Sequence, residues 1–213
     1  MNLKLQCVVP ENIEKEKTRN SQIWSRDILI NKGEHLHIVA PSGSGKTSFI
    51  LFIYGIRNDY SGKIFYDDQI LKELGTEDLS MLRQKNISIV FQDLKLFNEE
   101  TVRANIEIKR QLNPFHDAEM IDEMAVLLGI ESKLNQQLKK CSYGEQQRVA
   151  IIRALMQPFD FLLLDEPFSH LDENNRAKAM KLIYGECDKR NAAMIFADLK
   201  SSEYFKGEKV LML

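Results

Sequence analysis

Residues 40–47 read Ala40-Pro41-Ser42-Gly43-Ser44-Gly45-Lys46-Thr47. The segment that leads into them, residues 36–40, is apolar and predicts a strand, and the apolar run at residues 49–56 predicts a helix that begins near Lys46. A glycine-rich loop between a strand and a helix is typical of α/β proteins. We therefore expect an α/β fold built around this strand, loop and helix.

The loop matches the phosphate-binding pattern G-x-x-x-x-G-K-S/T except at its first position, where Ala40 replaces glycine. Gly43 and Gly45 let successive N–H groups point inward at a phosphate, and the following helix adds the positive end of its dipole. Lys46 would contact the β- and γ-phosphates, and Thr47 would offer its hydroxyl to Mg²⁺. The alternative is a turn that merely links two elements. The predicted phosphate-binding set is Ser42, Gly43, Ser44, Gly45, Lys46, Thr47 and Ser48.

A second apolar run, residues 161–164, ends in the acids Asp165 and Glu166. A P-loop needs a carboxylate at the end of a neighbouring buried strand. We expect Asp165 to hold Mg²⁺ through water and Glu166 to polarise or deprotonate a water that attacks the γ-phosphate. A strand that ends in solvated acids is the alternative.

Composition excludes several classes of protein. The 213 residues are 44% apolar and 28% charged, which is ordinary for a globular chain and not for a disordered or collagen-like one. A net charge of −2 gives no global attraction to nucleic acid. The longest apolar run, residues 49–56, is far shorter than the roughly 18 residues of a membrane span, and no secretory signal precedes it. Three cysteines without a C-x-x-C pair are expected to be reduced thiols.

The rest of the chain alternates strands with helical patterns. Residues 101–140 have helical periodicity, and Met120, Met124, Leu127 and Leu128 fall at the spacing of a buried helix face. We expect one domain over residues 1–213, with an inserted helical subdomain at about residues 93–157, and a polar loop at residues 11–21. Strands are expected at residues 3–9, 27–30, 36–40, 63–66, 87–91, 160–164, 192–197 and 209–213.

Three further motifs complete a resemblance to the ATP-binding cassette (ABC) family, specifically the nucleotide-binding subunits of ABC transporters. Val90-Phe91-Gln92-Asp93 is similar to the Q-loop, and Ser169-His170-Leu171-Asp172 is similar to the D-loop. Residues 141–149 resemble the signature Leu-Ser-Gly-Gly-Gln and its continuation. The same serine and glutamate spacing also predicts a capping box at a helix start, and both readings can hold together. The resemblance covers nearly the whole chain.

The resemblance implies a P-loop NTPase core with a mostly parallel sheet and a small N-terminal antiparallel part. It implies that ATP and Mg²⁺ bind, that Gln92 reaches the metal and the attacking water, and that Lys46 and Glu166 are catalytic. It also implies a head-to-tail dimer, homomeric or heteromeric, in which Ser142, Gly144 and Glu145 face the nucleotide of the opposite subunit. Nucleic acid is not an expected partner.

Residues 91–97 and 101–106 are similar to the small ATPases of lipoprotein-release, cell-division and macrolide-export permeases. The resemblance therefore implies a separate membrane permease as partner, and a cytoplasmic position on the inner face of the cell membrane. By the same resemblance, the permease contact is expected at residues 94–100.

The sequence departs from the family in ways that bear on catalysis. Ala197 stands where the switch histidine belongs, and a methyl group makes no hydrogen bond to the γ-phosphate, so hydrolysis is expected to be weak. Tyr143 replaces the first signature glycine, which puts the cross-dimer phosphate contact in question. Residues 3–23 contain no aromatic side chain to stack on adenine, and Trp24 is the nearest candidate.

Two functions remain open at this stage. The first is a working ATPase that energises a permease through ATP-driven dimer closure. The second is a hydrolysis-poor nucleotide-binding subunit that regulates or depends on a better partner cassette. A soluble ABC ATPase that acts on DNA or ribosomes is disfavoured, because the chain carries no coiled coil or tandem cassette.

Overall fold

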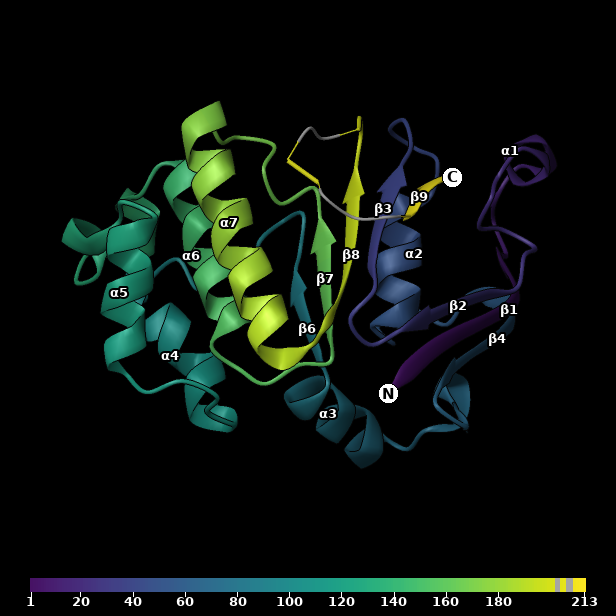
Figure 1. Cartoon of the computed structure of the whole chain (residues 1–213), viewed down its shortest axis with the longest axis horizontal. Coiled ribbons are helices and arrows are strands. Elements are labelled where there is room, and N and C mark those ends of the chain that lie inside the picture. Colours follow the sequence, from purple (N-terminus) through teal and green to yellow (C-terminus); the bar gives the residue numbers. More distant parts are fainter. Residues whose placement is uncertain (202–203, 206–208) are drawn as a thin grey trace.

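The computed structural model describes residues 1–201, 204–205 and 209–213. Within these residues, five strands form a parallel sheet and four form an antiparallel sheet beside it (Figure 1). In spatial order, the parallel sheet contains β6 (Ile87–Val90), β7 (Phe161–Asp165), β8 (Ala193–Asp198), β3 (His35–Val39) and β9 (Lys209–Met212). The antiparallel sheet contains β2 (Ile28–Asn31), β1 (Asn2–Pro10), β4 (Tyr60–Tyr66) and β5 (Gln69–Ile70). The expected parallel sheet with a small antiparallel part is confirmed.

Helices cover the parallel sheet on both faces. On one face lies α2, and on the other lie α6 and α7, with α4 and α5 farther out on the same side (Figure 1). Short 3-10 turns occur at Leu71–Glu73, Glu131–Lys133 and Leu138–Lys140. The helices are α1 (Lys15–Arg19), α2 (Lys46–Ile53), α3 (Thr76–Lys85), α4 (Val102–Leu112), α5 (Glu119–Leu127), α6 (Tyr143–Leu155) and α7 (Glu173–Arg190).

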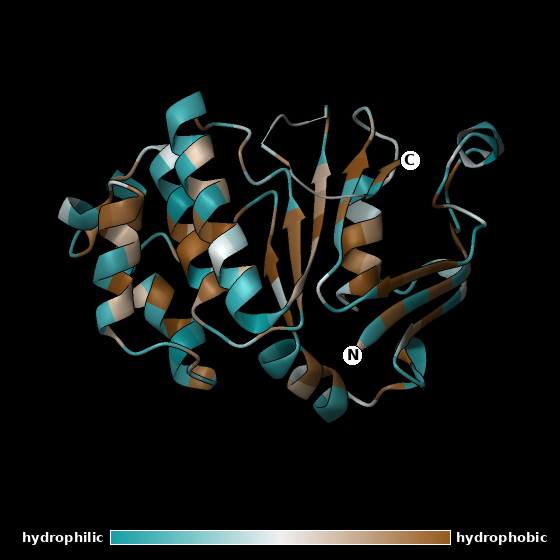
Figure 2. Cartoon of the chain, in the orientation of Figure 1, coloured by the Kyte–Doolittle hydropathy of each residue, from teal (hydrophilic) through white to brown (hydrophobic). Residues whose placement is uncertain are grey.

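Strand β7 is buried on both faces, which explains its unbroken apolar sequence. Phe161 and Leu163 belong to the core that α2 and the antiparallel sheet share, whereas Leu162 and Leu164 belong to the core under α4–α7. Successive side chains of a strand point to opposite faces, so one strand serves both cores. Figure 2 shows this central band of hydrophobic strands with polar outer helix faces. The carboxyl end of β7, where the two acids lie, is thereby held between two packed layers.

The helical pattern expected in residues 101–140 is observed, with one error in its buried face. Helices α4, α5 and α6 lie within residues 93–157. On α5 and just after it, Met124 and Leu128 are fully buried and Met120 is partly buried, but Leu127 is 57% exposed. The buried face of this helix is centred on Ile121, Met124 and Leu128, and Leu127 lies beyond the edge of that stripe.

Three elements were not predicted. Helix α1 lies inside the expected polar loop, α3 has only one buried side chain, Leu82, and β5 is two residues long. Because α3 has no apolar stripe, hydrophobic periodicity does not detect it. Its start is marked instead by the acidic Glu77 and Asp78 and its end by basic residues, which suit the helix dipole.

The described residues contain no helix that is both long enough and apolar enough to cross a bilayer. The three cysteines are free thiols, as expected; Cys7 is exposed, whereas Cys141 and Cys187 are buried.

Candidate functional site

The glycine-rich loop connects β3 to α2 at the carboxyl edge of the parallel sheet (Figure 1). Gly43 and Gly45 have φ angles of 75° and 103°, in the left-handed region that favours glycine. Ala40 is not among the residues with positive φ, so alanine fits at that position without strain, as expected. Gly45 is the N-cap of α2 and provides no side-chain cap, which leaves the first N–H groups of the helix free to bind an anion.

Lys46 points into the centre of the loop. Its Nζ donates to the carbonyl oxygens of Ala40 and Pro41 at 2.8 and 3.0 Å, and lies 3.4 Å from Oε1 of Glu166. The lysine side chain is only 4% exposed, so these acceptors satisfy a charge that water does not reach. The predicted P-loop lysine and the predicted second acid of β7 therefore meet in space.

Glu166 sits in a strained backbone position directly after β7. Its φ is 46°, and its N–H donates to the carbonyl oxygen of Ala197 on β8 at 2.9 Å. A left-handed conformation is uncommon for a residue other than glycine and is typical of functional sites. The neighbouring strand thus holds the Glu166 backbone, so its carboxylate faces the loop.

Asp165, Thr47 and Gln92 form the oxygen-rich part of the site. Thr47 donates its hydroxyl hydrogen to Oε1 of Gln92 at 3.1 Å. Asp165 is 2% exposed, its Oδ1 has no hydrogen-bond partner among the described residues, and burial raises the pKa of its carboxyl to about 6. An unpartnered buried carboxylate oxygen beside a hydroxyl and a carboxamide suits Mg²⁺, which prefers oxygen ligands. The residues predicted to bind the metal therefore fit it.

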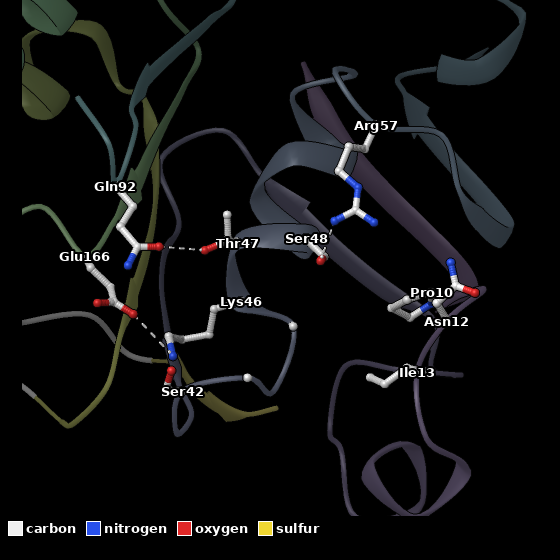
Figure 3. A pocket seen from close by; sticks show the side chains of 12 residues that line it. Pro10, Asn12, Ile13, Ser42, Lys46, Thr47, Ser48, Arg57, Gln92 and Glu166 are labelled. Atoms are coloured by element: carbon white, nitrogen blue, oxygen red, sulfur yellow. Dashed lines mark hydrogen bonds and ion pairs between the residues drawn. The ribbon is translucent and has the colours of Figure 1, made fainter. Parts of the chain in front are cut away.

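A cavity of about 330 Å³ lies against Lys46, Thr47, Gln92 and Glu166, whereas Asp165 is not part of its lining (Figure 3). Gln92 and Glu166 lie at one end of it, and Pro10, Asn12 and Ile13 lie at the other. It is lined by Pro10, Asn12, Ile13, Ser42, Gly43, Gly45, Lys46, Thr47, Ser48, Arg57, Gln92 and Glu166. The sequence did not indicate Pro10, Asn12, Ile13 or Arg57, because no motif connects them and only the fold of β1 and β4 brings them to the loop.

The other predicted site residues lie outside this lining. The hydroxyl of Ser44 is buried without a hydrogen-bond partner. Ser142, Gly144 and Glu145 form the start of α6, where the predicted capping box is present. The Ser142 Oγ accepts from the Glu145 N–H at 3.3 Å, and the Ser142 N–H donates to Glu145 Oε2 at 2.7 Å. The signature serine therefore has a structural role within this chain.

A family model described as ABC transporter matches residues 26–169, which is more than half of the chain. The chain belongs to the ABC transporter family. This ABC domain is 30% identical over 187 residues to the lipoprotein-releasing system ATP-binding protein LolD of Buchnera aphidicola subsp. Schizaphis graminum, covering 86% of this chain and 82% of LolD. It is 34% identical over 160 residues to the macrolide export ATP-binding/permease protein MacB of Nitrosomonas europaea, covering 74% of this chain and 24% of MacB.

The ABC domain also resembles a solved ATP-binding cassette, MJ0796, a dimer in a post-hydrolysis state bound to ADP and phosphate. The TM-score is 0.81 at 25% identity, with 99% of this chain and 94% of that chain covered. The domain spans only about a quarter to about half of the length of several curated relatives that it matches. The resemblance to small lipoprotein-release and macrolide-export ATPases is confirmed at the level of homology.

Trp24 cannot act as the base-stacking residue of this ABC domain. Its side chain is 0% exposed, and its ring packs edge-on against Phe49 and Phe52 at centroid distances of 5.9 and 6.3 Å. A Cβ atom on Gly45 would lie 3.1 Å from this ring. Trp24 therefore supports the P-loop from beneath and does not line the cavity.

Tyr143, at the first signature glycine position, links the signature helix of the ABC domain to the Q-loop. Its Oη donates to the carbonyl oxygen of Gln92 at 3.1 Å, and its ring lies 4.3 Å from that of His170. A Cβ atom on Gly144 would lie 2.9 Å from the His170 carbonyl oxygen, so the second glycine is required by close packing. The tyrosine hydroxyl is a contact that the sequence pattern did not reveal.

Proposed function

We propose that this chain is the ATP-binding and hydrolysing subunit of an ABC transporter, and that ATP-driven closure of a dimer energises a separate membrane permease. One observation carries the proposal. The Nζ of the P-loop Lys46 lies 3.4 Å from Oε1 of Glu166, and the residue before Glu166, Asp165, has a buried carboxylate oxygen without a partner among the described residues. Family membership and the LolD relative support the same conclusion.

The loop would bind the phosphates of ATP. The uncapped N–H groups at the start of α2 and the positive-φ glycines form an anion site, and Ser42, Ser48 and Lys46 add polar contacts around it. Lys46 would exchange its carbonyl acceptors for phosphate oxygens, which are stronger acceptors because they are charged. Binding then releases Glu166 from its contact with the ammonium group.

Glu166 would act as the general base. Once Lys46 turns to the phosphates, the Glu166 carboxylate is free to accept a hydrogen bond from a water and to take its proton as that water attacks the γ-phosphate. Gln92 faces the same cavity and would orient the water through its carboxamide. We expect the basal rate to be low, because Ala197 offers no side-chain hydrogen bond at the end of β8.

Asp165, Thr47 and Gln92 would hold Mg²⁺. When bound there, the ion neutralises charge on the phosphate oxygens as the γ-phosphoryl group is transferred. Asp165 Oδ1 is the buried acceptor that lacks a partner within the described residues, and Thr47 already directs its hydroxyl toward Gln92. These side chains supply the hard oxygen atoms that Mg²⁺ prefers.

The signature residues would act on a second copy or a related subunit. Ser142, Gly144 and Glu145 do not line the cavity of their own chain, so they fit a role at the nucleotide of a head-to-tail partner. The dimeric MJ0796 cassette, at 25% identity, supports this arrangement. The dimer is homomeric or heteromeric.

The permease would lie against residues 94–100. Phe97 in this segment is 54% exposed, and Leu94 and Lys95 have positive φ, so the segment projects an apolar side chain from a tight turn. Such a contact would put the chain at the cytoplasmic face of the membrane. Cysteine crosslinking tests this contact. A cysteine at position 97 is expected to crosslink to the co-expressed permease. Crosslinks from a distant control position, such as position 29, without any from position 97 would contradict the proposed contact.

Steady-state ATPase assays with Mg²⁺ test the catalytic proposal. Glu166→Gln is expected to lower the rate by about 10²- to 10⁴-fold relative to wild type, because it removes the general base. Equal rates would refute it. Ala197→His is expected to raise the ATPase rate above a low wild-type rate. Because Ala197 is buried, the folding of this variant is checked first. A silent wild type that Ala197→His activates would instead favour the hydrolysis-poor subunit, which the comparisons do not favour.

A further inference from the structure

The far end of the cavity, away from the P-loop lysine, has an unusual composition. Pro10, Asn12 and Ile13, at and just beyond the end of β1, form one part of its wall, and Arg57 forms another (Figure 3). None of the twelve described residues that line the cavity is aromatic. A nucleotide whose phosphates lie on the P-loop and whose base lies in this end would find no aromatic ring among these residues to stack on.

Arg57 is held in a fixed orientation. Its Nε donates to Asp59 Oδ1 at 2.9 Å, a second nitrogen contacts the other oxygen of Asp59, and Nη1 donates to the hydroxyl of Ser48 at 2.9 Å. The guanidinium carbon lies 5.3 Å from the ring centroid of the buried Phe52. A planar group that is tied at its edge and rests over a ring presents its remaining surface to the cavity, and the side chain is 38% exposed.

The charge of Arg57 is already paired. The hydrogen bond from Arg57 lowers the pKa of the Asp59 carboxyl, so this carboxylate stays ionised beside the guanidinium at neutral pH. A paired guanidinium attracts a phosphate less strongly than a free one, but its flat face remains available for stacking. Ser48, which holds one edge of Arg57, lies in the first turn of α2 directly after Thr47, so Arg57 stands immediately beyond the phosphate site.

We propose that the guanidinium of Arg57 is the stacking surface for the base of the bound nucleoside triphosphate, with Pro10 and Ile13 providing apolar contact at the same end of the cavity. The Arg57 guanidinium would then lie between the Phe52 ring and the base. The proposal rests on the nucleotide-binding function proposed above. Because a flat cation contacts the face of a base and not its edge, the site takes either purine. The Asn12 carboxamide both donates and accepts, so it pairs with the edge of adenine or guanine.

Binding calorimetry with ATP, GTP and inorganic tripolyphosphate, each with Mg²⁺, tests the proposal. Arg57→Lys keeps the charge but removes the plane. This substitution is expected to lower the affinities for ATP and GTP by about three- to thirtyfold and to leave the affinity for tripolyphosphate unchanged. Wild type is expected to bind ATP and GTP within about threefold of each other.

Arg83→Lys is the matched control. Arg83 also lies over an aromatic ring, with its guanidinium carbon 5.1 Å from the Tyr54 ring centroid, but it does not line the cavity. Its substitution is expected to leave all three affinities unchanged, and thermal unfolding of both variants verifies that they fold. Ile13→Tyr adds an aromatic ring to the end of the cavity where Arg57 lies. It is expected to raise the affinity for ATP and to leave the affinity for tripolyphosphate unchanged.

The outcomes separate the proposal from the function on which it rests. If Arg57→Lys weakens tripolyphosphate as much as ATP, Arg57 contacts phosphate and the stacking proposal fails. An unchanged ATP affinity in Arg57→Lys also overturns it, as does a strong wild-type preference for one purine. If wild type binds neither ATP nor tripolyphosphate, the nucleotide-binding function itself fails.

Discussion

Gly45 carries the strictest conformational demand of the P-loop. Its φ of 103° lies in the left-handed region, and a Cβ atom there would lie 3.1 Å from the buried Trp24 ring. Backbone conformation and packing therefore both disfavour a side chain at this position. The same glycine is the N-cap of α2, so it also sets where the anion-binding N–H groups point.

Gly45→Ala is expected to lower the free energy of unfolding by about 1–3 kcal/mol, because alanine is strained at this φ and crowds Trp24. Urea unfolding measures this loss, and ATP affinity is expected to fall with it. Gly185→Ala is the control. Gly185 lies inside α7, and a Cβ atom there would meet no described atom within 4 Å beyond the helix's own backbone. Alanine at this position is therefore expected to raise the free energy of unfolding by about 0.5–1 kcal/mol. Equal effects of the two substitutions would contradict this account.

At the scale of single elements, the helices differ in how their first turns are satisfied. Thr101, Ser142 and Asp172 cap α4, α6 and α7 by accepting a hydrogen bond from a backbone N–H. Helix α2, like α1, α3 and α5, has no side-chain cap among the described residues. Of these helices, α2 is the one that follows the glycine-rich loop, so its first N–H groups and the loop together can bind an anion.

Ser142→Ala and Thr101→Ala are each expected to cost about 1 kcal/mol of stability, because each removes one N-cap. Only Ser142→Ala is expected to lower the ATPase rate as well, since Ser142 is proposed to face the nucleotide of the partner subunit. Chemical unfolding and steady-state hydrolysis, measured on both variants, test this. Equal ATPase rates in the two variants would remove the cross-dimer role of Ser142.

At the scale of the whole molecule, a buried ionic cluster joins the segment before α5 to α7. Glu186 is 1% exposed, and His116, Lys189 and Arg190 contact its carboxylate at 2.5, 2.7 and 2.5 Å. Burial by itself raises the pKa of Glu186, but the hydrogen bonds from these three partners outweigh it and bring the pKa down to about 2. The ionised carboxylate therefore stabilises the folded state.

Glu186→Gln is expected to lower the free energy of unfolding at pH 7 by about 3 kcal/mol, because the buried charge that pairs with Lys189 and Arg190 is lost. The folded pKa lies below the ordinary value of 4.5, so the contribution is full above about pH 4.5 and disappears as the pH falls toward 2. Urea unfolding from pH 7 to 2.5 is expected to show wild type and variant converging. A constant difference over this range would contradict the assigned pKa.

The proposed dimer makes a second prediction at this scale. With ATP and Mg²⁺, the Glu166→Gln variant is expected to form a dimer with twice the monomer mass in light scattering, because it binds ATP but does not hydrolyse it. Lys46→Ala is expected to remain monomeric under the same conditions, since it loses the main cationic phosphate contact. Dimerisation of both variants to the same extent would show that association does not depend on bound ATP.

Much of the fold and part of the site were predictable from the sequence. The strand, loop and helix around Lys46, the acids at the end of β7, and the capping box at Ser142 were predicted correctly. Prediction failed for α3, which has almost no buried face, and for Leu127, which lies at the edge of an apolar stripe. Periodicity detects an element only when burial is regular along it.

The sequence by itself determined the local chemistry, because the glycines, lysine and threonine of the P-loop act through spacing within eight residues. Only the tertiary structure decided what surrounds this loop. It buried Trp24 beneath Gly45 and brought Ile13 and Arg57 to one cavity. It also set the Tyr143 hydroxyl on the Gln92 carbonyl. These partners are far apart along the chain, and sheet pairing and core packing, which act between distant segments, bring them together.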